Sequence, residues 1–201
     1  MASSAFLTIK APSEASMREK MSKFIAFAFP VTTAEEAKAK VAEVANRYHD
    51  ARHVCWAYRL GADGSETMAN DNGEPSGTAG RPILGAIRSA ELSNIVIAVV
   101  RYFGGIKLGT SGLITAYKEA ASLAIQAAEI IEDCELSQLS FTFPYQAVNS
   151  VMKITKSDPD ITVLSTDFNN TCSLTLSIRT DRLDDLCRRL SDISGVSLPN
   201  L

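Results

Sequence analysis

Two glycine-rich segments hold the residues of this sequence that could do chemistry. The first, residues 70–87, reads NDNGEPSGTAGRPILGAI and brings two acids and an arginine close together along the chain. Asp71 and Glu74 could act as a carboxylate pair or bind a hard metal ion, although such ions usually need more oxygen ligands than two acids supply. The alternative, which we favour, is structural: Asp71 caps a turn with Asn72, and Glu74 pairs with Arg81 or with a backbone N–H group.

The second segment, residues 101–113, reads RYFGGIKLGTSGL. It nearly spells a phosphate-binding loop, because Gly104 is followed at the right distance by Gly109 and Thr110, but the lysine that should follow the last glycine is missing. Lys107 stands inside the loop instead. A helix that starts near Gly109 would still present unpaired N–H groups to an anion, with the positive end of its dipole behind them. A sharp turn without a ligand is the other interpretation.

An anion site would draw on both segments. Eight of the eleven glycines lie between Gly73 and Gly112, so this part of the backbone is built for unusual conformations or close approach. We expect the two segments to meet in space and to leave peptide amides free for a negatively charged ligand. The candidate ligand-binding residues are Asp71, Glu74, Ser76, Thr78, Arg81, Arg101, Gly104, Gly105, Lys107 and Gly109.

Other reactive residues give weaker signals. His53 and Cys55 point the same way on a strand, so a nucleophilic pair is geometrically allowed if a base and a thiolate meet there. His49 and His53 have the spacing of a helical zinc site, but the predicted helix ends between them. The four cysteines form no CxxC pair. We therefore assign no catalytic residue and expect neither a cofactor nor a metal.

Several aromatic residues lie near basic ones in the sequence. Nucleic-acid bases stack on exposed aromatic rings of this kind, but aromatics in strands more often belong to the core. The aromatic residues concerned are Trp56, Tyr58, Tyr102 and Phe103, near Arg52, Arg59 and Arg101.

Composition and charge limit the function classes. Of 201 residues, 46% are hydrophobic and 21% are charged, as in ordinary globular proteins, and the net charge is −3. A large phosphate-binding surface is therefore not expected. The first residues lack a signal-peptide core, and the longest apolar run, residues 95–100, is too short to span a bilayer. We expect a cytoplasmic protein without membrane contact.

Hydrophobic periodicity predicts the elements that would position these residues. Strands are predicted over residues 4–10, 21–31, 53–61 and 94–105. Helices are predicted over residues 34–48, 83–89 and 110–130. The run at 94–105 is apolar enough for a central strand that is covered on both faces.

The pattern changes near residues 132–135. Beyond this point the expected order is β-α-β-β-α-β, the ferredoxin-like pattern, with Asp181 capping the second helix. The sequence therefore predicts two α+β domains, residues 1–132 and 136–201.

Both glycine-rich segments resemble motifs of the IMPACT family and, within it, of the bacterial YigZ-type members. The family patterns are approximately D-D-G-E-P-x-G-T-A-G-x-P, matched from Asp71 to Pro82, and R-Y-F-G-G-x-x-L-G-x-x-G-L, matched from Arg101 to Leu113. The second acid of the first motif is Asn72 here. A mechanism that needs two adjacent carboxylates is therefore in doubt, whereas a turn-forming role survives.

The resemblance implies a fold. It covers about residues 15–130, and the last 65 residues resemble the small second domain of YigZ-type members, with weaker motifs. We therefore expect an N-terminal ribosomal-protein-S5-domain-2-like domain of the IMPACT type. A C-terminal ferredoxin-like domain, similar to those of elongation factor G, is expected to follow.

The resemblance also implies a function. Eukaryotic IMPACT proteins are linked to translational control, and nucleic-acid binding has been suggested from fold similarity. We expect a non-enzymatic, translation-linked regulatory protein that binds RNA, the ribosome or a protein partner through the glycine-rich face. The alternatives are an enzyme acting on a phosphorylated small molecule or nucleotide, and a protein-binding module without a ligand.

Overall fold

Strand β6 (Ile95–Tyr102) is the centre of a five-stranded sheet in the structure, a computed structural model that describes residues 5–169 and 171–199. Seven of its eight residues are buried. An apolar, β-branched run of this kind is favoured where both faces of a strand are covered. The prediction of a central, doubly covered strand at 94–105 is confirmed, although the strand ends at Tyr102.

The sheet around β6 is antiparallel, in the order β2-β3-β6-β4-β5. Its other strands are β2 (Ser13–Glu19), β3 (Ser22–Pro30), β4 (His53–Leu60) and β5 (Glu66–Asn70). The edge strands β2 and β5 are absent from the sequence-based prediction because they carry few apolar residues. A separate two-stranded sheet pairs β1 (Ala5–Ile9) with β7 (Ile130–Cys134).

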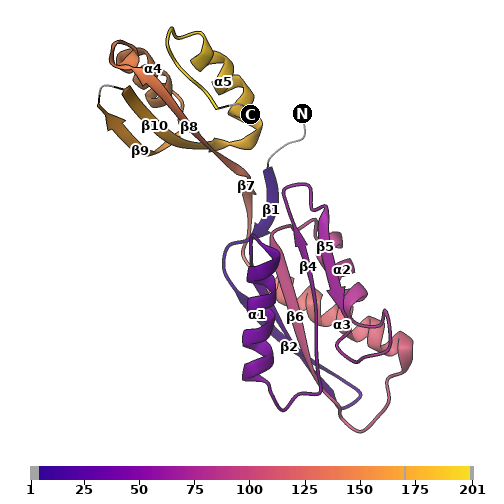
Figure 1. Cartoon of the computed structure of the whole chain (residues 1–201). Coiled ribbons are helices and arrows are strands. Elements are labelled where there is room, and N and C mark those ends of the chain that lie inside the picture. The colour runs from indigo at the N-terminus through magenta and orange to yellow at the C-terminus, as the bar shows by residue number, and fades with distance from the viewer. Residues whose placement is uncertain (1–4, 170, 200–201) are drawn as a thin grey trace. The chain divides into compact units, whose positions relative to one another are not determined.

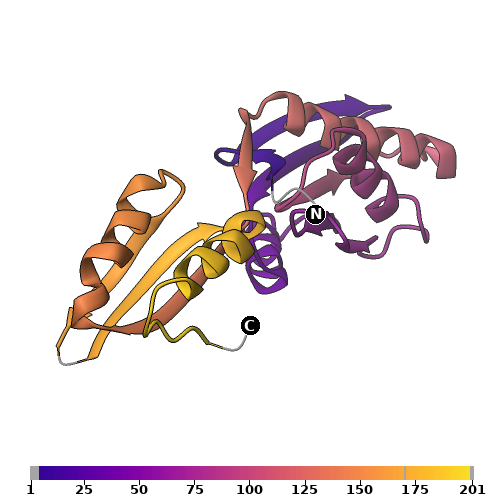
Figure 2. The same ribbon diagram turned by 90° about the horizontal axis from the view of Figure 1, so that it is seen from above.

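Helices cover both faces of the five-stranded sheet (Figures 1 and 2). Helix α1 (Ala34–Arg47) packs on one face, and α2 (Gly80–Ser89) and α3 (Gly109–Gln126) pack on the other. The predicted cap of α1 is present, since Thr33 Oγ1 accepts the amide of Glu36 at 3.2 Å. On α3 the buried stripe is rich in alanine, which lets the helix lie close to the sheet.

Beyond β7 the chain forms a three-stranded antiparallel sheet in the order β8-β10-β9, with two helices packed on it. The elements are β8 (Leu136–Pro144), α4 (Val148–Ser157), β9 (Thr162–Phe168), β10 (Thr171–Arg179) and α5 (Leu183–Ser191), with short 3-10 turns at Tyr145–Ala147 and Thr180–Arg182. The predicted order holds for five elements, and the sixth is an isolated bridge between Thr142 and Ser197. The expectation that Asp181 caps the second helix is wrong, because the N-cap residue of α5 is Arg182, without a side-chain cap. Asp181 instead accepts from Arg179, Nη2 to Oδ2 2.9 Å.

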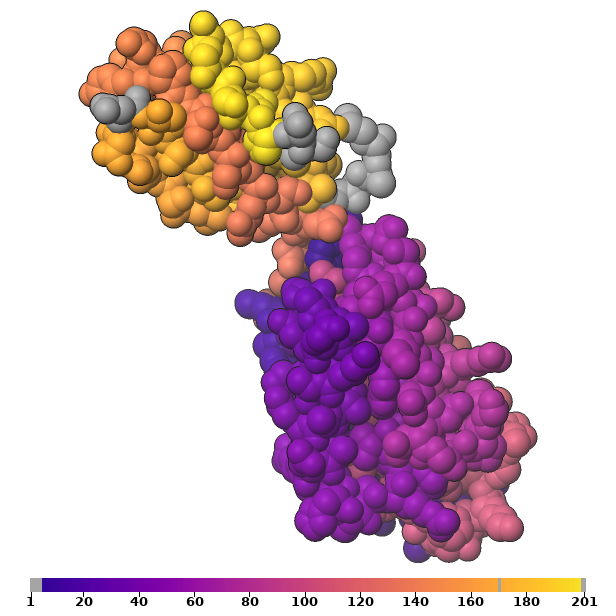
Figure 3. All heavy atoms as spheres, in the orientation of Figure 1, coloured from indigo at the N-terminus to yellow at the C-terminus, as the bar shows by residue number. Residues whose placement is uncertain are grey.

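Contacts within the chain define two units, Ala5–Asp133 and a second that starts at Cys134. Figure 3 shows the filled surface of the first unit from indigo to salmon and that of the second from orange to yellow. Each unit mixes sheet and helices. Their assignment to ribosomal-protein-like and ferredoxin-like domain classes stays a prediction. Among the described residues, no helix is long and apolar enough to cross a membrane.

Gly104 lies where a side chain cannot fit. A Cβ added there would come within 2.1 Å of the Met21 backbone and 2.5 Å of the Ser22 nitrogen, in the turn between β2 and β3. We expect Gly104→Ala to lower the free energy of unfolding by about 1–3 kcal/mol, because backbone must shift to accept the methyl group.

Gly85→Ala is the matched control. Gly85 lies inside α2 with open space around its Cβ position, so this substitution should raise the free energy of unfolding by about 0.5–1 kcal/mol. Urea denaturation measures both values. Wild-type stability in Gly104→Ala would refute the close approach of the two backbones.

Candidate functional site

A cavity of about 400 Å³ lies where the two glycine-rich segments meet. It is lined by Arg52, His53, Glu74, Pro75, Arg101, Phe103, Lys107, Leu108, Gly109, Thr110 and Leu113. The expectation that the segments come together is therefore confirmed. The wall carries three cationic side chains and one carboxylate, a formal balance of +2.

The candidate residues divide into two groups. Those that line the cavity are Glu74, Arg101, Lys107 and Gly109. Those outside its lining are Asp71, Ser76, Thr78, Arg81, Gly104 and Gly105. Thr78 is buried, and its hydroxyl donates to the carbonyl of Pro75 at 2.6 Å. The glycines have backbone roles, since Gly104 abuts the β2–β3 turn and Gly105 has a φ of +89°. Ser76 and Arg81 are exposed.

The carboxylate of Asp71 faces its own loop. Oδ2 accepts the amide of Gly77 at 2.7 Å, and Oδ1 accepts those of Ala79 and Gly80 at 3.0 and 2.8 Å. Partial burial raises the pKa of Asp71. The three amide hydrogen bonds lower it by more than burial raises it, so the pKa lies below its ordinary value. The expectation that this segment leaves its amides free is wrong, because the chain's own carboxylate neutralises the start of α2.

Glu74 pairs with Arg101, not with Arg81. Arg101 Nη1 donates to Glu74 Oε1 at 2.6 Å, and the Tyr117 hydroxyl donates to the same oxygen at 2.8 Å. The two charged side chains are only 8% and 4% exposed. Asp71 and Glu74 therefore have separate partners and do not form a carboxylate pair.

The guanidinium of Arg101 is held by aromatic rings. It lies 5.7 Å from the ring centre of Phe24 and 5.6 Å from that of Phe103. Its Nε is buried and has no hydrogen-bond partner among the described residues. Arg101 therefore lines the cavity with Nη1 paired to Glu74 and with its Nε enclosed by protein.

The Cys–His pair that the sequence allows does not form. The Cys55 thiol is buried, and its Sγ lies 2.9 Å from the Asp71 carbonyl oxygen and 3.3 Å from the Tyr117 hydroxyl oxygen, the two acceptors for its single hydrogen. Burial raises the pKa of Cys55 to about 12, so a thiolate is not available near neutral pH. His53 Nδ1 instead lies 2.8 Å from the carbonyl oxygen of Asn72.

Asn72 has the turn-forming role expected for it. Its φ is +41°, and its Oδ1 accepts the amide of Val54 at 2.9 Å, which fastens the loop to β4.

Among residues 5–169 and 171–199, no group of three or more His, Cys, Asp or Glu side chains could hold a metal ion.

The start of α3 differs from that of α2. Its N-cap residue, Leu108, makes no side-chain cap, and the first turn holds no acidic residue. Gly109 has a φ of +75°, and a Cβ added there would meet nothing within 4 Å. Gly109 and Thr110 line the cavity, so the first residues of α3 lie at its wall.

Phe103 lines the cavity but is missing from the candidate ligand-binding residues. It is 54% exposed as a residue, whereas Trp56 and Tyr58 are buried in the core. The available signal is its place just beyond the central strand, directly before two glycines. Arg52 is a second residue missing from the candidate set, and it comes from the loop before β4.

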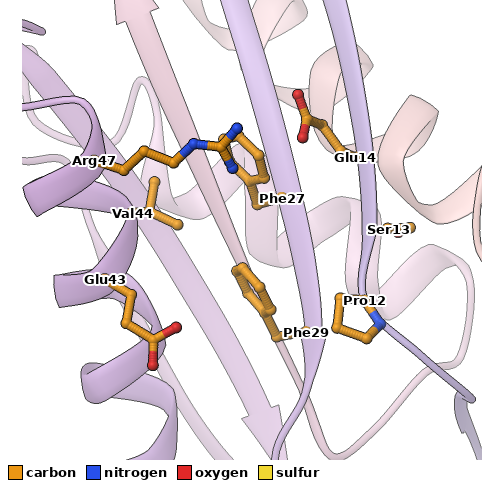
Figure 4. Close-up of a pocket in the computed structure, with 8 residues that line it drawn as sticks. All are labelled: Pro12, Ser13, Glu14, Phe27, Phe29, Glu43, Val44 and Arg47. Carbon is orange, nitrogen blue, oxygen red and sulfur yellow. The ribbon is translucent and has the colours of Figure 1, made fainter.

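A second hollow, of about 310 Å³, lies beside α1 and the strands β2 and β3 (Figure 4). Arg47 lies over the ring of Phe27 there, 5.8 Å from its centre. Two carboxylates, of Glu14 and Glu43, outnumber this single cation. An anion is therefore better suited to the cavity between the glycine-rich segments.

Fold and site together define a mixed α/β protein whose glycine-rich loops frame a cationic cavity. Residues 20–125 match the family model of the Impact N-terminal domain. An IMPACT family member of Haemophilus influenzae is 32% identical, over 88% of this chain and 86% of that protein. The chain belongs to the IMPACT family.

Other relatives agree with this assignment. YigZ of Escherichia coli is 30% identical, over 89% of this chain and 88% of its own length. YvyE of Bacillus subtilis is 37% identical over 63% of this chain, and the chain spans only 58% of that relative.

Solved structures include a similar fold. The protein is similar to a hypothetical protein of known crystal structure, with 28% identity and a TM-score of 0.76. The match covers all of this chain and 98% of the other chain. The two-domain translational regulator Yih1 is 27% identical over 61% of this chain and 47% of that chain, but its TM-score of 0.36 is too low to support an argument.

Asp71→Asn tests the cap of α2. A lowered pKa means that the ionised carboxylate stabilises the folded state above the ordinary pKa of Asp, about 3.9, and that this stabilisation is lost as the pH falls through the folded-state pKa. We expect the variant to lose about 1–2 kcal/mol of unfolding free energy at pH 7, with a smaller difference below about pH 4. Urea titrations across this range measure it. A loss that is the same at every pH would show that the charge of Asp71 is not involved.

Proposed function

We propose that this protein is a translation-linked regulatory protein that binds RNA through the cavity between its glycine-rich segments, without catalysis. The observation that carries the proposal is the combination of a +2 wall, an exposed aromatic ring and an uncapped helix start in one cavity. Membership of the IMPACT family, whose eukaryotic members are linked to translational control, supports the regulatory part.

Phe103 gives the cavity a surface on which a base can stack. Stacking of one base on an exposed aromatic ring contributes about 1–3 kcal/mol and tolerates any base. Phe103 is 54% exposed as a residue, and the Arg101 guanidinium lies 5.6 Å from the centre of its ring. Arg101 is itself held by Glu74, so the ring has a fixed cationic neighbour.

Three of the reactive side chains near the cavity favour binding over catalysis, and a fourth, His53, has its Nδ1 2.8 Å from the carbonyl oxygen of Asn72. Cys55 is a buried thiol, Asp71 is occupied by backbone amides, and Glu74 is held by Arg101 and Tyr117. A general base must reach a substrate proton, and a nucleophile must reach a substrate atom. These three side chains are instead committed to the fold.

Salt dependence tests the proposal directly. Binding of a fluorescent single-stranded RNA, followed by anisotropy, should weaken with salt along a slope of about −0.7 to −1.4, since each neutralised phosphate releases about 0.7 counterions and a +2 wall neutralises one or two phosphates. A slope near zero, or the absence of binding at low salt to single-stranded and structured RNA, would refute the proposal. A thermal shift with nucleotides or sugar phosphates in that case would favour the small-molecule enzyme.

Charge reversal locates the binding site. We expect Lys107→Glu to weaken RNA binding about tenfold or more, because Lys107 lines the cavity. Lys118→Glu is the control: it makes the same charge change at an exposed position of α3 outside the cavity lining. Equal weakening by both variants would indicate unspecific attraction rather than a site.

A further inference from the structure

We infer that the cavity binds a nucleoside 5′-monophosphate group, with the phosphate at the start of α3 and the base on Phe103. This inference rests on the proposed function, and it names the part of the RNA that enters the cavity: its phosphorylated 5′ end.

The charge of the wall favours an end group. Arg52, Arg101 and Lys107 oppose the single carboxylate of Glu74, which leaves +2. A phosphate monoester carries about −1.5 to −2 at pH 7, whereas a phosphodiester inside a strand carries a single negative charge. The wall therefore matches a terminal phosphate better than an internal one.

The guanidinium of Arg101 has hydrogen-bond donors without a partner among the described residues. Its side chain is 8% exposed, and of its nitrogens only Nη1 donates a hydrogen bond among the described residues. A guanidinium carries five N–H donors, and buried donors without partners cost about 1–3 kcal/mol each. Nε is enclosed by protein and out of a ligand's reach, but Nη2 donates to no described residue, so an anionic ligand in the cavity that Arg101 lines can accept from Nη2.

A comparison of the starts of α2 and α3 also supports a phosphate at α3. At α2 the amides are taken by the carboxylate of Asp71. At α3 there is neither a side-chain cap nor an acid in the first turn. The open space at the Cβ position of Gly109, which lines the cavity, lets a ligand approach the backbone closely. A phosphate bound at the start of α3 would accept hydrogen bonds from its amides, as the Asp71 carboxylate does at the start of α2.

The size of the cavity fits one nucleotide. Its volume of about 400 Å³ lies at the small end of the range for ligand cavities, about 300–1,000 Å³. Phe103 lies in the same wall as Gly109 and Thr110, so one ligand can stack its base and place its phosphate within a single cavity.

Competition binding distinguishes this inference from the proposed function. The probes are two versions of one 3′-labelled single-stranded RNA hexamer, with a 5′-phosphate or a 5′-hydroxyl, and the competitors are AMP and adenosine. We expect the phosphorylated RNA to bind at least tenfold more tightly, and AMP but not adenosine to displace it.

Each other outcome has a defined meaning. If both RNAs bind equally, RNA binding stands and the phosphate inference is overturned. If AMP binds but neither RNA does, the phosphate chemistry stands with a free nucleotide as its source, and the proposed RNA function fails. If none of the probes binds, both fail.

Thr110→Glu places a carboxylate in the first turn of α3, as Asp71 does at α2. We expect the variant to lose the preference for the phosphorylated RNA, to within about twofold, while its melting temperature is kept or raised, because an acid at a helix start is stabilising. Thr115→Glu is the control, with the same charge change at an exposed position farther along α3, and it should keep the preference. A tenfold preference that survives in a folded Thr110→Glu protein would overturn the inference.

Discussion

The buried ion pair between Glu74 and Arg101 joins the parts of the first unit that make the cavity. Arg101 belongs to the central strand β6, Glu74 to the loop before α2, and Tyr117, which donates to Glu74, to α3. Removing one partner of such a pair leaves a buried charge, which typically costs about 3–5 kcal/mol. Because both partners also line the cavity, the stability of the fold and the geometry of the site depend on one contact.

The glycine-rich segments have different roles, although both lead into a helix. The first is closed on itself, since Asp71 takes up the amides that open α2. The second leaves the start of α3 at the wall of a cationic cavity. The chain therefore stabilises one helix start with its own carboxylate and leaves the other without a side-chain cap. This division supports the proposed binding function, because the Asp71 carboxylate is already part of the fold.

Local patterns in the sequence predict most of the fold but only part of the site. The apolar run of β6 and the helical stripe of α3 are confirmed, because each pattern reports burial along one element. The polar edge strands β2 and β5 carry no such pattern. The partner of Glu74 depends on sheet register and lies 27 positions away, so a sequence reading chooses the nearer Arg81. The exposure of Phe103 likewise follows from where β6 ends, which periodicity alone fixes poorly.

The most direct measurement is an NMR titration of the ¹⁵N-labelled protein with a 5′-phosphorylated RNA dinucleotide. We predict saturable shifts of the backbone amides of Gly109, Thr110 and Ser111. The amides of Gly77 and Gly80 should stay in place, since Asp71 holds them. Amides at the start of α3 that do not move at saturating ligand, or that move no more than those at the start of α2, would contradict an anion site at α3.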